Sequence, residues 1–147
     1  MNAIYWAMGA TCVGKKHFIR AASANPAAFG LPDGLLPTWI ADGDLSVEQI
    51  LEQAEHCPLI IRWQWGREST LEKIRQQRPD VRQSLFVCKV NPSVQVQRVV
   101  AREGSLKWEE RALIRESEDV EYLAQKLSMT HGLAVRYIDA SKEYATS

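Results

Sequence analysis

The sequence has no long apolar run and no excess of either charge. None of its apolar segments approaches the ~18–20 residues needed to cross a bilayer, and its first residues lack the basic and apolar regions of a signal peptide. The 18 basic and 18 acidic residues leave a formal net charge of zero at pH 7, which argues against a protein that coats nucleic acid by charge alone. We therefore expect a cytoplasmic protein that does not enter a membrane.

Paired cysteines are also lacking. Cys12, Cys57 and Cys88 are odd in number, and none belongs to a C-x-x-C pair, so the sequence suggests neither a disulfide framework nor a zinc site. The composition is otherwise ordinary for a globular protein, with 46% apolar and 24% charged residues. We expect one domain spanning residues 1–147, large enough to bury most of its surface without cross-links.

The most specific motif is a glycine-rich loop that follows an apolar run at residues 3–7. Gly9, Gly14 and Lys15 have the spacing G-x-x-x-x-G-K, which is typical of a phosphate-binding loop between a strand and a helix. The glycines let the backbone turn N–H groups toward a phosphate, the helix N-terminus adds its positive end, and the lysine contacts the terminal phosphates. A turn that binds nothing is the alternative. The predicted nucleotide-binding residues of the loop are Gly9, Ala10, Thr11, Cys12, Val13, Gly14, Lys15 and Lys16.

One residue departs from this motif. Phosphate-binding loops normally carry Ser or Thr directly after the lysine, and the hydroxyl of that residue ligates magnesium. In this chain the position is occupied by Lys16. We therefore interpret the loop as a nucleoside-triphosphate site with an unusual metal arrangement.

Strand and helix patterns alternate along the chain. Apolar runs typical of strands are separated by segments with helical periodicity or helix caps, and right-handed crossovers then leave little alternative to a parallel sheet. The sequence therefore predicts an α/β fold, a three-layer α/β/α sandwich with a five-stranded parallel sheet. The predicted strands are residues 3–7, 38–41, 58–63, 84–90 and 134–138, and the longest predicted helix covers residues 107–130.

Three helix starts carry recognisable caps. Ser46 with Gln49, and Ser69 with Glu72, have the spacing of capping boxes. Asn91 precedes a proline, which suits the first position of a helix. We expect helices to begin at these three points.

Polar residues that follow the strands should meet at the ligand, because open α/β sheets bind at the carboxyl ends of their strands. Asp42 and Asp44 flank a glycine after the second predicted strand. A hydroxyl that attacks a γ-phosphate needs a carboxylate to orient it or take its proton, and a second oxygen ligand can hold Mg²⁺. We therefore predict catalytic and metal-binding roles for both aspartates. A turn that feeds the cap at Ser46 is the alternative, and Glu68 is the nearest other candidate base or metal ligand.

The third predicted strand ends without the acid that nucleotide-loop enzymes often carry there. Instead it ends in Arg62, Trp63, Gln64 and Trp65, and Arg67 follows shortly after. The tryptophans could stack on an unpaired or flipped base, and the glutamine amide could hydrogen-bond the edge of that base. We predict that these five residues bind the substrate. Tryptophans packed in the core and arginines on a solvated helix face are the alternatives.

Arg98 and Arg102 lie four residues apart on a predicted helix and should share a solvent-facing stripe. After a glycine, Arg111 and Arg115 repeat this spacing. Two arginine-bearing helices joined at a glycine suggest a small helical lid around residues 98–115 that closes cations over a transferred phosphoryl group. We predict catalytic roles for the first two arginines. Ordinary solvated helix faces are the alternative, and we favour that explanation for the second pair.

The order of these parts resembles the small P-loop kinases, in the branch that contains polynucleotide, gluconate and nucleotide kinases. The resemblance covers nearly the whole chain, and the glycine-rich loop is its most specific part. It implies a P-loop fold with strand order 2-3-1-4-5. The segments that carry it are residues 9–15, 42–44, 86–92 with Arg98 and Arg102 after them, and 135–141.

The resemblance also implies an activity, which is phosphoryl transfer from ATP with Mg²⁺. It implies that Lys15 contacts the phosphates, that Asp42 or Asp44 activates the acceptor hydroxyl, and that the two lid arginines act on the transferred group. It further implies that adenine lies near residues 140–144, with Ser141 among its contacts.

Three functions are open from the sequence. The first is a kinase whose acceptor is a hydroxyl on a nucleotide or on DNA. In its tryptophan-rich third strand and its compact size, the chain resembles phage enzymes that phosphorylate 5-hydroxymethyluracil in DNA. A phage enzyme of this kind would act in the host cytoplasm. The second is a kinase for a free nucleoside or small metabolite. The third is a nucleotide-binding module without catalysis.

Overall fold

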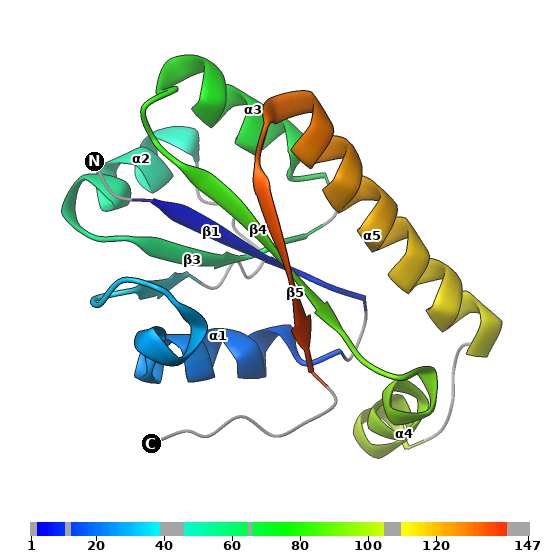
Figure 1. Ribbon diagram of the computed structural model, residues 1–147. Helices are drawn as coiled ribbons and strands as arrows, with labels where there is room; N and C mark the ends of the chain where they lie inside the picture. The colour runs from blue at the N-terminus through cyan, green and yellow to red at the C-terminus, as the bar shows by residue number, and fades with distance from the viewer. Residues whose placement is uncertain (1–2, 11–12, 39–45, 65, 105–109, 141–147) are drawn as a thin grey trace.

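The computed structural model describes residues 3–10, 13–38, 46–64, 66–104 and 110–140 (Figure 1). None of the helices described there has the length and apolar character of a membrane span. The helices are α1 (Lys15–Ala24), the 3-10 turn η1 (Pro26–Phe29), α2 (Val47–His56), α3 (Glu68–Gln77), α4 (Pro92–Glu103) and α5 (Glu110–His131). The strands are β1 (Ile4–Met8), β2 (Leu36–Thr38), β3 (Leu59–Arg62), β4 (Gln83–Lys89) and β5 (Ala134–Asp139).

The five strands form one parallel sheet in the order β2-β3-β1-β4-β5. β1 is central: Ile4 pairs with Leu59 of β3 on one side and with Gln83 of β4 on the other. Parallel neighbours need long crossover connections, which the helices provide. The predicted three-layer fold and its strand order are therefore confirmed.

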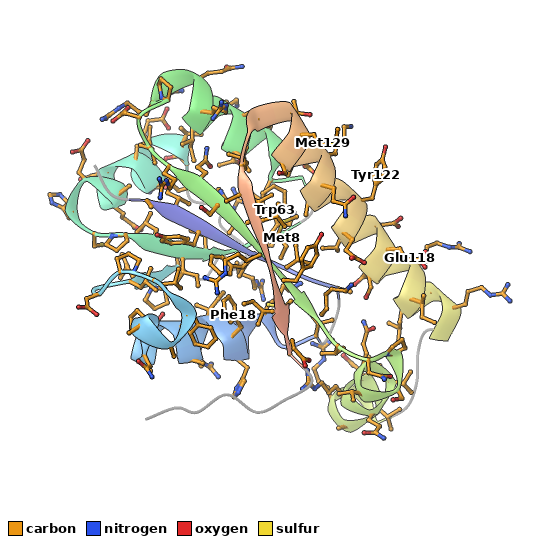
Figure 2. All side chains as sticks on the ribbon, viewed as in Figure 1. Met8, Phe18, Trp63, Glu118, Tyr122 and Met129 are labelled. Atoms are coloured by element: carbon orange, nitrogen blue, oxygen red, sulfur yellow. The ribbon has the colours of Figure 1, made fainter. Side chains whose placement is uncertain are left out.

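Side-chain alternation along β1 divides the apolar residues between two cores. Trp6 and Met8 face the core that α2, α3 and α5 cover, which also contains Trp63. Ala7 faces the opposite core, where Phe18 of α1 is fully buried. Figure 2 shows Phe18 on α1, away from Met8 and Trp63. Because both faces of the strand are covered, β1 reads as a continuous apolar run in the sequence.

A buried amide links the sheet to α3. The Gln83 side chain accepts a hydrogen bond from Trp6 Nε1 at 2.9 Å and donates one to the Leu71 carbonyl at 3.1 Å. Gln83 is only 4% exposed, and a buried amide is costly unless such partners satisfy it. These bonds hold α3 against β1 and β4.

The second strand lies earlier in the chain than the sequence predicted. β2 covers Leu36–Thr38, and residues 39–41 of the predicted strand lie outside the described part of the chain. Pro37, which directly precedes the predicted strand, is inside the observed one. A residue without an N–H group is tolerated here because β2 is an edge strand, paired only with β3.

Two of the three predicted caps are confirmed. Ser46 Oγ accepts from the Gln49 amide at 3.2 Å, and the Gln49 side chain accepts from the Ser46 amide at 2.8 Å. Asn91 likewise caps α4, whose first residue is a proline. The box predicted at Ser69 is wrong, because α3 begins at Glu68 after the N-cap Arg67, and the Ser69 hydroxyl donates to the Gly66 carbonyl at 3.5 Å.

Candidate functional site

The glycine-rich loop packs closely against the end of β4. A Cβ atom on Gly9 would lie 2.5 Å from Val13 Cγ2 and 3.1 Å from the Cys88 carbonyl oxygen. The first of these distances is shorter than real Cβ contacts allow, so the position requires glycine. The loop is thus drawn tightly back toward the sheet, and of its predicted residues Thr11 and Cys12 lie outside the described chain.

The second glycine of the motif turns the chain into α1. Gly14 has φ 95° and ψ 30°, a left-handed conformation that favours glycine, and it is the N-cap of the helix. The helical ladder starts directly after it, with Phe18 N donating to Gly14 O at 2.9 Å. The positive end of the α1 dipole therefore lies at the loop, as phosphate binding requires.

Lys15 is held by the loop itself. Its Nζ atom donates to the Gly9 carbonyl oxygen at 2.6 Å. Cys88 lies nearby and is only 2% exposed. Burial raises the pKa of its thiol to about 12, and the positive charge of Lys15 has a smaller, opposite effect. The ammonium group thus lies over the loop, next to an uncharged thiol, where an anion entering the loop can replace the carbonyl as its partner.

A pocket of about 570 Å³ opens in front of the loop. It brings together the loop, the first turns of α1, the end of β3, and one side each of α4 and α5, although these segments are far apart in the sequence. Its charged groups are mostly cationic. The residues that line it are Gly9, Val13, Gly14, Lys15, Lys16, His17, Arg20, Arg62, Trp63, Gln64, Arg102, Glu116 and Val120.

Nine of these residues were predicted from the sequence, and they lie around one pocket; their roles remain predictions. The sequence reasoning missed the other four, which are His17, Arg20, Glu116 and Val120. Arg20 had a usable signal, because it lies four residues after Lys16 and so on the same side of α1. Glu116 and Val120 had none, because only the packing of α5 beside the site places them there.

The sequence predicted that Arg98 lies on a solvent-facing stripe, but in the structure its guanidinium turns toward the backbone. Its Nη1 atom donates to the Val13 carbonyl at 3.1 Å and its Nη2 atom donates to the Ala140 carbonyl at 2.7 Å. The guanidinium therefore connects α4 to the loop and to the end of β5, and it is absent from the described pocket wall. Arg102 does line the pocket, with its side chain 57% exposed and paired with Glu103 at 3.1 Å.

Trp63 belongs to the core and also lines the pocket, and the base stacking predicted for it stays a prediction. The residue is 5% exposed, and its ring packs edge-to-face on Trp6 with centroids 5.3 Å apart and an interplanar angle of 83°. Its amide continues the β3 ladder by donating to the Ala7 carbonyl at 2.8 Å. Strand parity places it on the same face as Ile61, toward the interior. Trp65 lies outside the described residues.

Arg67 lies apart from the loop. It is 5% exposed and borders a second pocket of about 430 Å³, which Lys73 also lines, between the start of α2 and the outer side of α3. Its Nη1 atom contacts Thr70 Oγ1 at 3.4 Å. Arg67 therefore lines a different pocket from Arg62, and the substrate contact predicted for it stays a prediction.

The described residues around the pocket suit an anion and do not fit Mg²⁺. Lys16 replaces the usual hydroxyl ligand, and an ammonium group has three donors but no acceptor with which to ligate a metal. Glu116 is the one carboxylate on the described pocket wall, and no cluster of three or more His, Cys, Asp or Glu residues occurs in the described part of the chain. The predicted ligands Asp42 and Asp44, and the predicted adenine contact Ser141, lie outside it.

Solved structures with the same architecture include a sugar kinase from Janibacter sp. HTCC2649, which aligns over 95% of this chain and 86% of its own at 15% identity and a TM-score of 0.53. The tunicamycin resistance protein of Deinococcus radiodurans aligns over 92% of this chain and 99% of its own, at 14% identity and a TM-score of 0.54. A chain of the Pnkp1/Rnl/Hen1 RNA repair complex aligns over 99% of this chain and 49% of its own, at 15% identity and a TM-score of 0.51.

No protein-family model matches the sequence, and no curated protein matches it either. At 14–15% identity, the likeness to the solved structures concerns the path of the backbone. Together with the parallel sheet and its strand order, it shows that this chain has the same three-layer α/β/α fold as these proteins.

Proposed function

We propose that the protein is a phosphotransferase that moves the γ-phosphate of ATP to a hydroxyl group of an acceptor. The observation that carries this proposal is the position of Lys15, which opens α1 at a left-handed glycine and lies on the wall of a pocket. In phosphoryl transfer the protein contributes mainly positioning and charge stabilisation, and a helix N-terminus with a lysine supplies both.

Asp42 and Asp44 are the candidate general base and the candidate ligands of Mg²⁺, the cofactor that the family resemblance implies. The order of the chain supports this role, because both residues follow β2, whose carboxyl end lies at the same edge of the sheet as the loop. Arg102 is the candidate lid arginine, since it reaches the pocket wall from α4. Arg98 instead positions the loop.

The acceptor that the pocket suits best carries negative charge, as a nucleotide or DNA does. Arg62 and Gln64 line the pocket at the end of β3, and Arg20 lines it from α1. Guanidinium groups bind phosphate oxygens well, and the glutamine amide can hydrogen-bond a base. A 5-hydroxymethyluracil base in phage DNA is our leading specific acceptor of this class.

A kinase for a sugar or another small metabolite is the second candidate. The likeness to a sugar kinase over 95% of this chain favours it, because a neutral hydroxyl compound would use the same loop. A nucleotide-binding module without catalysis is the third candidate, favoured by the ammonium group that Lys16 places where a metal ligand is usual.

The decisive experiment incubates the protein with γ-labelled ATP and a panel of modified DNAs, nucleotides, nucleosides and sugars, and identifies which acceptor receives the label. We expect transfer to an anionic acceptor, reduced by roughly a hundred- to a thousandfold in Lys15→Ala and in Asp42→Ala. Lys126→Ala is the matched control, because Lys126 is exposed on α5 and is not part of the pocket wall.

The outcomes separate the candidates. Labelling of neutral sugars or nucleosides alone would support the metabolite kinase. Binding of ATP without transfer to any acceptor would support the module without catalysis. Equal transfer by Asp42→Ala and the unaltered protein would move the role of base to Asp44 or Glu68.

A further inference from the structure

Lys16 occupies the position from which a phosphate-binding loop normally supplies its metal ligand. It is the second residue of α1, its side chain is exposed, and it lines the pocket beside Gly14 and Lys15. Neighbouring residues of a helix point in directions about 100° apart, so the two lysines reach different parts of the pocket. Lys15 turns back to the Gly9 carbonyl, whereas Lys16 forms no ion pair with any residue in the described chain.

Replacing the hydroxyl by an ammonium group changes what this position can bind. A hydroxyl offers lone pairs to a metal ion, but an ammonium group offers only donors and repels the cation. The surrounding wall adds to this repulsion, since Lys15, Arg20 and Arg62 line it and Glu116 is the only carboxylate that the described wall contributes. The same groups attract an anion.

We infer that Lys16 takes over the charge-neutralising role of the metal ion in phosphate binding, so that the loop holds a nucleoside triphosphate with little dependence on a divalent cation. This inference rests on the proposed function, because it concerns the same nucleotide. The Lys16 ammonium group donates to the oxygens of the bound phosphates, next to the contact that Lys15 makes, and the N-terminal end of α1 adds its partial positive charge.

The test measures binding of a non-hydrolysable ATP analogue by isothermal titration calorimetry, once in Mg²⁺ and once in EDTA. We expect the dissociation constant of the unaltered protein to differ by less than about threefold between the two buffers. A weakening of about tenfold or more in EDTA would overturn the inference, because a metal ion would then carry part of the binding.

Two substitutions separate the charge of Lys16 from the ligand it replaces. Lys16→Met removes the ammonium group at similar length, and we expect binding to weaken at least about tenfold in both buffers. Lys16→Thr restores the usual hydroxyl, and we expect its binding to weaken in EDTA and to recover in Mg²⁺. Lys126→Thr is the control for loss of one surface charge and should bind like the unaltered protein, and thermal melting checks that every variant is folded.

The variants also supply outcomes that contradict the inference. Binding by Lys16→Met that matches the unaltered protein in EDTA would show that this ammonium group does not contact the phosphates. Recovery of Lys16→Met by Mg²⁺ would show that other residues hold a metal ion there. Absence of binding by the unaltered protein in both buffers would overturn the nucleotide site itself and with it the proposed function, whereas binding that requires Mg²⁺ would overturn the inference alone.

Discussion

Gly9 lies where β1 passes into the glycine-rich loop, and its lack of a side chain determines how closely the loop approaches β4. An alanine Cβ would meet Val13 Cγ2 at 2.5 Å and the Cys88 carbonyl at 3.1 Å. Neither neighbour retracts easily, because valine is stiff at χ1 and the carbonyl belongs to a strand. We expect Gly9→Ala to lower the free energy of unfolding by roughly 1–3 kcal/mol and to weaken nucleotide binding, measured by urea denaturation and calorimetry.

A second substitution tests the cause. Gly9→Ala combined with Val13→Ala removes the closer of the two contacts, so it should recover part of the lost nucleotide affinity. If the single variant bound nucleotide as tightly as the unaltered protein, the close approach of the loop to β4 would not matter for binding.

The buried thiol of Cys88 should make the free energy of unfolding depend on pH above about pH 9. Burial raises the pKa of its thiol from 9.0 to about 12 in the folded protein. Below pH 9 the thiol is protonated in both states, so it has no effect on the pH dependence. Between about pH 9 and pH 12 the unfolded chain loses this proton and the folded chain keeps it. The free energy of unfolding should therefore fall with pH, by up to about 1.4 kcal/mol per pH unit.

The measurement compares urea denaturation of the unaltered protein and Cys88→Ala between pH 9 and pH 11, a window just below the folded pKa of Cys88. The variant should lack this component of the slope, whereas Cys57→Ala, at a partly exposed position, should keep it. Equal slopes for the unaltered protein and Cys88→Ala would mean that the buried thiol titrates normally.

Single residues were predictable where a short motif determines their role. The spacing of Gly9, Gly14 and Lys15 was sufficient to place the loop at the start of a helix. The hydrogen bonds of Arg98 were not predictable, because both acceptors are backbone carbonyls, at Val13 and Ala140. Every residue has a backbone carbonyl, so the residue types at these positions do not indicate the bonds.

At the scale of elements, the two serines at helix starts form a natural comparison. Ser46 makes both bonds of a capping box for α2, whereas Ser69 lies inside the first turn of α3. We expect Ser46→Ala to lower the free energy of unfolding by about 1 kcal/mol, because an amide at the start of α2 loses its acceptor. Ser69→Ala should change it by less than about 0.5 kcal/mol in the same urea titration.

The reverse ranking of the two serine variants would contradict the helix boundaries described above. The comparison also shows why sequence patterns identified the elements better than their ends. The Ser-x-x-Glu spacing occurs at both sites, but the turn at Gly66 starts α3 before Ser69. Likewise Pro37 looks like a loop residue until its position on the sheet edge is known.

At the scale of the whole molecule, Arg98 connects three parts of the chain that come together only on folding. It lies on α4 and donates to the carbonyls of Val13 in the loop and Ala140 after β5. Hydrogen bonds from a charged donor are worth more than neutral ones. We expect Arg98→Met to lower the free energy of unfolding by roughly 2 kcal/mol in urea denaturation.

Arg102→Met is the matched control, since its side chain is 57% exposed and pairs only with the adjacent Glu103 among the described residues. We expect it to change stability by less than about 0.5 kcal/mol and to act instead on phosphoryl transfer. Equal loss of stability in the two variants would contradict the distinction between a positioning arginine and a pocket arginine.

The overall topology could be predicted because alternating strands and helices admit few arrangements, and the family resemblance supplied the strand order. The pocket could be predicted only in part. Residues at the ends of β1 and β3 follow from the rule that ligands bind at carboxyl ends of strands. Glu116 comes from the side of α5, and its position depends on how that long helix crosses the sheet.

The central position of β1 bears on how the chain acquires its structure during synthesis. β1 precedes both of its neighbours in the chain, so Ile4 can pair with Leu59 only after β3 has been made and with Gln83 only after β4 has been made. Until then its apolar residues have no permanent cover, which makes the nascent segment a natural client for chaperones. The glycine-rich loop that follows β1 can pack against β4 only after β4 has been translated.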